Sequence, residues 1–95
     1  MYSKVKTCVL QGLNGFVVEV ETDISKGLPV FNIVGLPDIS IKESKERVRT
    51  SIKNSGYEFP LNRITINLAP ANIKKEGSQI DLAIAIGIRS AMNYI

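Results

Sequence analysis

Residues 30–68, VFNIVGLPDISIKESKERVRTSIKNSGYEFPLNRITINL, decide the fold of this chain. The apolar run 30–34 is short and is followed by glycine and proline, which predicts a strand that ends in a turn. Residues 38–54 predict a helix, and residues 63–68 alternate as a strand does. A strand, a helix and a second strand in this order predict a βαβ unit. Its two strands are then parallel and its crossover right-handed.

The ends of this helix have their own signals. Asp38 is a good N-cap residue, and Ser40 with Glu43 offers a competing capping box two residues later. Gly56 stands where a glycine commonly follows the last helical residue. The sequence therefore predicts a helix that begins at one of two nearby positions and ends near Asn54.

The predicted helix has one narrow apolar stripe and a strongly charged remainder. Ile41, Val48 and Ile52 form the stripe at helical steps, while Glu43 and Arg47 form a neighbouring pair of opposite charge. The charged faces suit contact with phosphates, but a solvated amphipathic helix has the same pattern. The candidate phosphate contacts on this helix are Lys42, Lys45, Arg49 and Lys53.

The N-terminal third predicts a β-hairpin. Residues 3–11 and 16–24 are rich in strand formers, and Asn14–Gly15 between them is a strong signal for a type I′ turn. In the second strand Phe16, Val18, Val20 and Thr22 share one face, opposite an acidic face that we expect to meet solvent. The fold class is therefore α/β (α+β). We expect a mixed sheet of about four strands, made of a hairpin and a βαβ unit, with two helices on one face.

The last segment predicts a helix from about Ser78 onward that is apolar on almost every side. One stripe is formed by Ile80, Ile84, Ile88, Ala91 and Ile95, and it is widened by Leu82, Ala85, Ile86 and Met92. Such a helix needs cover on almost every side, more than one four-stranded sheet gives. We therefore expect residues 1–95 to be a single domain, a fragment of a longer protein truncated at its C-terminus, with a tendency to self-associate.

Composition excludes several classes of site. There is no histidine, so Ser-His-Asp and Cys-His sites and most zinc sites are excluded. Cys8 is the single cysteine, which fits a reducing, cytoplasmic compartment. The net charge of +3 is compatible with nucleic acid without being diagnostic of it. No segment suits a signal peptide or a membrane span, so we expect a soluble protein and no membrane partner.

The junction before the last helix is the most plausible place for chemistry. Ser78 at a helix N-terminus, with Lys74 and Lys75 nearby, allows a Ser-Lys dyad, but serine at a helix start more commonly caps the helix, and composition favours that role. The chain has no Gly-x4-Gly-Lys-Ser/Thr motif, which excludes a P-loop nucleotide site.

Two pairs of carboxylates remain. Glu19 and Glu21 suit a solvated strand face, and Asp81, near Glu76, suits the helix dipole in the first helical turn. A metal site is unsupported by either pair, and we expect no metal.

Several motifs in order resemble one family. They are VEVETDISKGLP (18–29), FNIVGLPD (31–38), KESKERVR (42–49), NSGYEFP (54–60), RITINLAPA (63–71) and KEGSQIDLAIA (75–85). Together they resemble the start of the magnesium-chelatase-like AAA+ proteins of the ComM/YifB group, almost from end to end.

The resemblance implies an N-terminal domain with a fold like that of the Lon protease domain, followed by an AAA+ ATPase module as its partner. It implies ATP and Mg²⁺ for the longer protein and no cofactor in this fragment. It also implies a role in DNA processing of the branch-migration and competence type, and further strands beyond Ile95 that cover the last helix.

The likeness to Lon also implies that the junction before the last helix has no peptidase activity. Active Lon-type domains have Gly-Pro-Ser at the helix N-terminus, whereas here Gly77 is followed by Ser78 and Gln79. Gln79 occupies the serine position, and the lysine of the dyad would lie beyond Ile95. We therefore expect no catalytic residue and no enzyme activity in this fragment.

The leading hypothesis is a non-catalytic accessory domain of a DNA-processing ATPase that supports assembly or contacts DNA. The DNA-contact candidates are Lys74, Lys75, Lys42, Lys45, Arg49 and Lys53. The alternatives are a remnant of a Lon-like Ser-Lys peptidase that uses Ser78, and a protein-interaction module.

Overall fold

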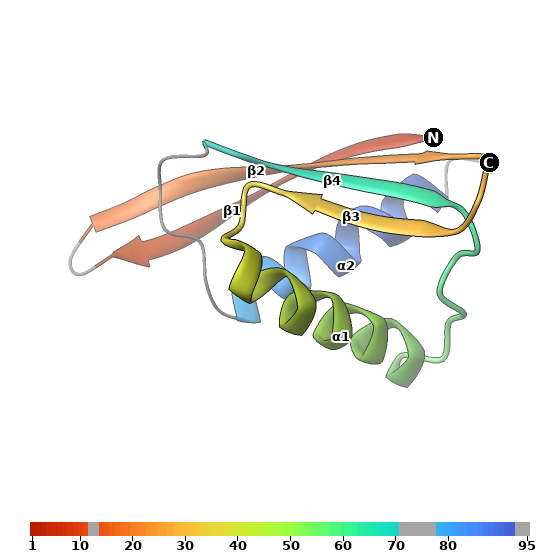
Figure 1. Ribbon diagram of the computed structural model, residues 1–95. Coiled ribbons are helices and arrows are strands. Elements are labelled where there is room, and N and C mark those ends of the chain that lie inside the picture. The colour runs from red at the N-terminus through yellow and green to blue at the C-terminus, as the bar shows by residue number, and fades with distance from the viewer. Residues whose placement is uncertain (12–13, 71–77, 93–95) are drawn as a thin grey trace.

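In the computed structural model, four strands form one mixed sheet and both helices cover the same face of it (Figure 1). The structure describes residues 1–11, 14–70 and 78–92. The strand order is β1-β2-β4-β3, and this architecture confirms the predicted fold class. The elements in chain order are β1 (Tyr2–Gln11), β2 (Asn14–Ser25), β3 (Val30–Val34), α1 (Asp38–Asn54), β4 (Arg63–Ala69) and α2 (Ser78–Met92).

The strand pairing is as the sequence predicts. β3 and β4 are parallel and are joined through α1, while β2 pairs antiparallel with both β1 and β4. Gly35 ends β3 with a φ of +106°. A Cβ there would lie 2.5 Å from the carbonyl oxygen of Leu68, so this turn requires glycine for both its conformation and its close approach to β4.

The predicted start of α1 is wrong in detail. Pro37 is the N-cap residue and makes no side-chain cap hydrogen bond, while Asp38 is already the first helical residue. Ser40 lies inside the first turn, with its backbone N–H bonded to the carbonyl of Pro37. Proline fixes the chain just before the helix, and Asp38 stabilises the helix through the dipole instead of through a cap.

The predicted end of α1 is confirmed. Gly56 has a φ of +85°, and its N–H bonds the carbonyl of Lys53 at 3.0 Å. The N–H of Tyr57 reaches back to the carbonyl of Ile52 at 3.2 Å. These two bonds form a Schellman motif, which satisfies carbonyls that the helix itself leaves unpaired.

The hairpin turn is not at Asn14–Gly15. Asn14 pairs with Gln11 and Gly15 with Leu10, so both residues belong to β2 and the connection falls at residues 12–13. Neither residue has a positive φ. Continued pairing with β1 outweighs the local turn preference of Asn-Gly, because each added pair extends the ladder.

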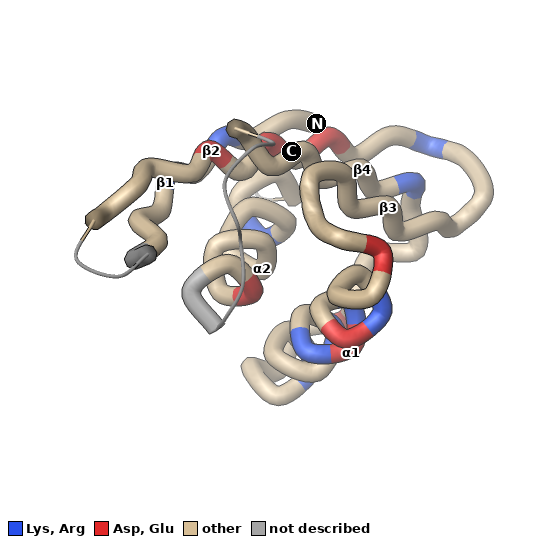
Figure 2. Tube along the Cα trace, turned by 60° about the vertical axis from the view of Figure 1, so that its left-hand side comes forward, with Lys and Arg blue, Asp and Glu red and all other residues tan. Residues whose placement is uncertain are grey.

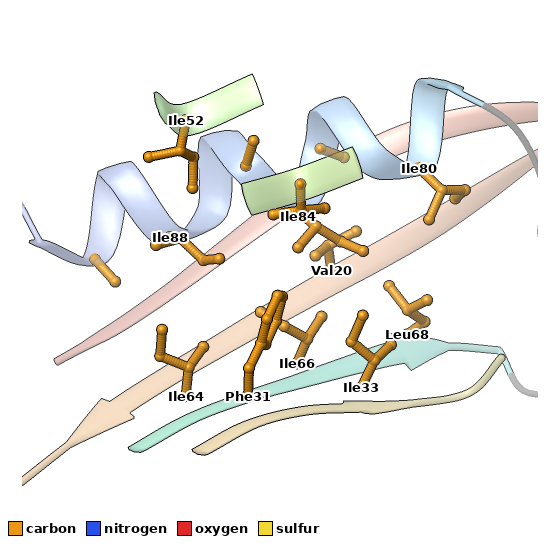
Figure 3. Close-up of a cluster of buried hydrophobic side chains, with 14 of the residues drawn as sticks. Val20, Phe31, Ile33, Ile52, Ile64, Ile66, Leu68, Ile80, Ile84 and Ile88 are labelled. Atoms are coloured by element: carbon orange, nitrogen blue, oxygen red, sulfur yellow. The ribbon is translucent and has the colours of Figure 1, made fainter. Parts of the chain in front are cut away.

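The core lies between the sheet and the two helices (Figure 3). The predicted inward face of β2 is confirmed, since Val18, Val20 and Thr22 are fully buried. β4 contributes Ile64, Ile66 and Leu68 to the same layer. The opposite face of the sheet carries polar residues, and there Lys4 lies within 4 Å of Glu19 and Glu21.

α2 packs closely on the hairpin. The hydroxyl of Ser3 donates to the carbonyl of Gly87 at 2.7 Å, and a Cβ at Gly87 would lie 2.5 Å from Oγ1 of Thr22. Four residues of the predicted stripe, Ile80, Ile84, Ile88 and Ala91, are buried, and Ile95 lies outside the described residues.

Two of the four residues that widen the predicted stripe are exposed, whereas Ala85 is buried. Leu82 is 60% exposed and Ile86 is 45% exposed. One sheet and one helix therefore cover α2 only in part, as its composition predicts. Within the described residues, neither helix has the length and hydropathy needed to cross a bilayer.

Candidate nucleic-acid interface

Four of the predicted DNA contacts lie along one stripe of α1. Lys42, Lys45, Arg49 and Lys53 follow one another at steps of three and four residues, which places them on one side of a helix. Eleven residues separate the first from the last, a rise of about 16 Å. We call these four residues the α1 basic stripe.

Arg49 anchors the α1 basic stripe to the rest of the fold. Its guanidinium lies over the ring of Phe31 at 5.5 Å and over the ring of Phe59 at 5.4 Å, and the two ring centroids are 5.1 Å apart. Phe31 belongs to β3 and Phe59 to the connector before β4. The stripe therefore runs along the flank of α1 that faces β3, and one of its members also has a packing role.

On the other flank of α1, Arg47 pairs with a carboxylate of α2 within the fold. Nε of Arg47 donates to Oδ2 of Asp81 at 2.5 Å, and the hydroxyl of Ser44 donates to Oδ1 at 2.7 Å. Asp81 is only 6% exposed, and Glu43 lies 3.6 Å from Arg47 on the outer side. These contacts join α1 to α2 and leave Arg47 out of the stripe.

The electrostatics of this pair follow from its geometry. The pKa of Arg47 lies above its ordinary value, first because Asp81 accepts its hydrogen bond and then because the two opposite charges attract. Arg47 therefore stays charged at any physiological pH. The sequence predicted a structural role for Asp81 through the helix dipole, but it missed Ser44 and Arg47 as partners. The signal for Ser44 was present, because it stands at helical spacing between Ile41 and Val48.

The three lysines of the stripe form no ion pair with a carboxylate in residues 1–11, 14–70 and 78–92. Among the described residues, the lysines that lie within 4 Å of a carboxylate are Lys4 and Lys6, both on the open face of the sheet. Lys42 and Lys53 are exposed and Lys45 is half-buried. Figure 2 shows that Lys and Arg positions (blue) and Asp and Glu positions (red) are mixed along α1. Within the described part of the chain, the stripe is thus a row of cations without an ion-pair partner on a helix of mixed charge.

The predicted site residues in the junction before α2 cannot be placed relative to the stripe. Lys74, Lys75 and Gly77 lie outside the described residues. Gln79, which the sequence predicts at the position of the Lon-type serine, falls in the first turn of α2.

The carboxylates do not form a metal site in the described part of the chain, where no three potential ligands come together. Glu19 and Glu21 are instead engaged by Lys4 and Lys6 at 3.7 to 4.0 Å. Glu76 lies outside the described residues.

Comparison with known proteins adds the family context. A family model described as subunit ChlI of Mg-chelatase matches residues 20–95. The uncharacterized protein YifB of Escherichia coli (strain K12) is 52% identical over 93 residues, which is 98% of this chain and 18% of that protein. The competence protein ComM of Haemophilus influenzae is 44% identical over 84 residues, 88% of this chain and 16% of that protein.

A third relative extends the range of organisms. An uncharacterized protein of Mycobacterium tuberculosis (strain ATCC 25618 / H37Rv) is 45% identical over 82 residues, 86% of this chain and 16% of that protein. The chain spans less than a fifth of the length of these curated relatives.

Proposed function

This chain belongs to the Mg-chelatase-like family that contains YifB and ComM, and we propose that it is a non-catalytic accessory domain of a protein that processes DNA. The name of ComM connects that relative with competence. The observation that carries the proposal for this chain is the α1 basic stripe, a row of cations that form no ion pair with any carboxylate of the described residues.

The α1 basic stripe supports contact with the DNA backbone. Its cations are spread over about 16 Å of helix, long enough to reach several phosphates of one strand. Aromatic stacking platforms are scarce on this flank, because Phe31 is buried and Phe59 is half-buried beneath Arg49. The proposal is therefore binding through phosphates, without preference for base sequence.

The longer protein is proposed to be an AAA+ ATPase that uses ATP and Mg²⁺, with its ATPase module downstream of this domain. In this division of roles the domain binds and positions DNA, or supports assembly, while the module supplies the energy. The proposal places the protein in the cytoplasm, where the single free cysteine, Cys8, stays reduced.

The test is a titration of a labelled DNA duplex at several salt concentrations. Four phosphate contacts predict that log K falls with log [salt] with a slope of about −3.6. The variant Lys42→Gln/Lys45→Gln/Lys53→Gln should bind about tenfold more weakly or worse at low salt, and its slope should be shallower by about 0.9 for each lysine removed.

A matched control separates the stripe from net charge. Lys4→Gln/Lys6→Gln removes two cations that already have carboxylate partners on the open face of the sheet. This variant should keep the affinity and slope of the unmodified chain. Equal losses in both variants would mean that only total charge matters, and unchanged binding in the α1 variant would reject the stripe. In the same assay, equal affinity for Lys74→Glu/Lys75→Glu would remove that pair from the proposed interface.

A further inference from the structure

The four cations of the α1 basic stripe differ in how their side chains are held. The guanidinium of Arg49 lies 5.5 Å from the ring centroid of Phe31 and 5.4 Å from that of Phe59. The three lysines of the stripe form no side-chain hydrogen bond or ion pair with any described residue. On the basis of the function proposed above, we propose that Arg49 positions the DNA on the stripe. The two rings hold its guanidinium ready for a bidentate contact with one phosphate.

The two rings form a fixed support for this guanidinium. Phe31 is 5% exposed and belongs to the core, and the ring centroid of Phe59 lies 5.1 Å from that of Phe31. A ring face attracts a cation, and two rings at one spot restrict the positions that the side chain of Arg49 can take. A mobile side chain loses its freedom when it binds, which costs about two- to tenfold in affinity. Arg49 has lost part of that freedom before any DNA arrives.

The hydrogen-bonding groups of Arg49 remain available to a ligand. A guanidinium has five N–H donors, and the exposed Arg49 forms no hydrogen bond or ion pair with a described residue. Arg47 on the same helix is the contrast, because its Nε donates to Asp81 and its Nη1 lies 3.6 Å from Glu43. The rings therefore hold Arg49 without neutralising its charge, whereas carboxylates engage the charge of Arg47.

This support suits an arginine that binds phosphate. A planar guanidinium can stack on an aromatic face and offer parallel N–H groups to two phosphate oxygens, whereas a lysine ammonium binds as a point charge. Lys45 and Lys53 each lie four residues from Arg49, which is about 6 Å of helix rise on either side. A phosphate fixed at Arg49 therefore determines which neighbouring phosphates the two lysines reach.

The test is a double-mutant cycle on the whole chain, with the labelled duplex of the salt titration. Arg49→Lys keeps the charge and removes the planar fork, while Phe59→Leu keeps every charge and removes one ring. Each variant should bind about three- to tenfold more weakly, with the slope against log [salt] changed by less than about 0.5, because no cation is lost. In the Arg49→Lys background, Phe59→Leu should have no further effect, because both changes remove the same positioning.

Two controls separate positioning from a general effect on the connector. Tyr57→Leu removes the neighbouring ring, which holds Arg89 of α2 and no member of the stripe, and it should bind like the unmodified chain. Phe59→Tyr keeps a ring face under Arg49 and should restore most of the affinity that Phe59→Leu loses. Circular dichroism and urea unfolding establish that each variant is folded at the temperature of the titration.

Different results reject the role of Arg49 and the function proposed for the stripe. If the variant without the three lysines binds weakly while Arg49→Lys and Phe59→Leu bind like the unmodified chain, the stripe stands and the positioning role of Arg49 is rejected. Equal losses in Tyr57→Leu and Phe59→Leu, or an undiminished effect of Phe59→Leu in the Arg49→Lys background, also reject that role. An unmodified chain that shows no salt-dependent binding rejects the proposed function and the role of Arg49 together.

Discussion

At the scale of single residues, Gly87 and Thr22 show how closely α2 approaches the sheet. Thr22 is fully buried and its hydroxyl oxygen has no hydrogen-bond partner in the described structure. The same oxygen lies where a Cβ at position 87 would fall. The two residues therefore form one steric unit, although 65 positions separate them in the sequence.

Gly87→Ala should destabilise the protein by about 1–3 kcal/mol through this overlap, although alanine is the better helix former by about 1 kcal/mol. In the background Thr22→Ala the overlap is absent and the same change should be neutral or stabilising. Urea unfolding of the four variants measures the coupling. The same cost in both backgrounds would contradict the steric explanation.

At the scale of elements, the fold depends on how α1 and α2 are joined. The carboxylate of Asp81 accepts from Ser44 and Arg47, so one side chain of α2 holds two side chains of α1. A buried carboxylate is tolerated here because both of its oxygens have a donor.

Asp81→Ala should lower the free energy of unfolding by about 1–2 kcal/mol, because Ser44 stays buried without its acceptor. The cost stays modest because Arg47 is half exposed and can return to water. Glu43→Ala removes the exposed partner of the same arginine and should change stability by less than about 0.5 kcal/mol. Equilibrium urea unfolding distinguishes the two, and equal effects would contradict the assigned roles.

The sequence predicted local patterns well at this scale. The alternation of β2, the parallel pairing of β3 with β4 and the Gly56 helix end follow from neighbours in the chain. Helical spacing could place Ser44 on the buried side of α1, but the contacts of Asp81 with Ser44 and of Arg49 with two phenylalanines join distant segments, so no local pattern could predict the partners. The predicted turn at Asn14–Gly15 was wrong for the same reason. Pairing of these two residues with β1 outweighed their local preference for a turn.

At the scale of the whole molecule, the proposed DNA-binding surface is confined to one side. The α1 basic stripe lies on the β3 side, where Arg49 contacts Phe31. β1 forms the opposite edge of the sheet, so this surface leaves that edge uncovered.

The expectation that the domain is non-catalytic is tested on the whole chain. A serine-directed fluorophosphonate probe should not label it, because Gln79, which we expect at the position of a Lon-type nucleophile, has an amide that is no nucleophile. Denatured chain serves as the control for background reaction. Labelling of the folded chain that disappears in Ser78→Ala would instead support the Ser-Lys peptidase alternative.

The connector between α1 and β4 has no regular secondary structure, yet it contacts the rest of the fold at three places. Tyr57 lies under Arg89 of α2 at 3.6 Å, Phe59 lies against Phe31 and Arg49, and the carbonyl of Asn62 accepts from Val30 at 3.4 Å. Surface loops ordinarily accept insertions during evolution. Here one added residue between Tyr57 and Phe59 would displace one of the two rings from its contact. The contacts of these rings therefore constrain the length of the connector.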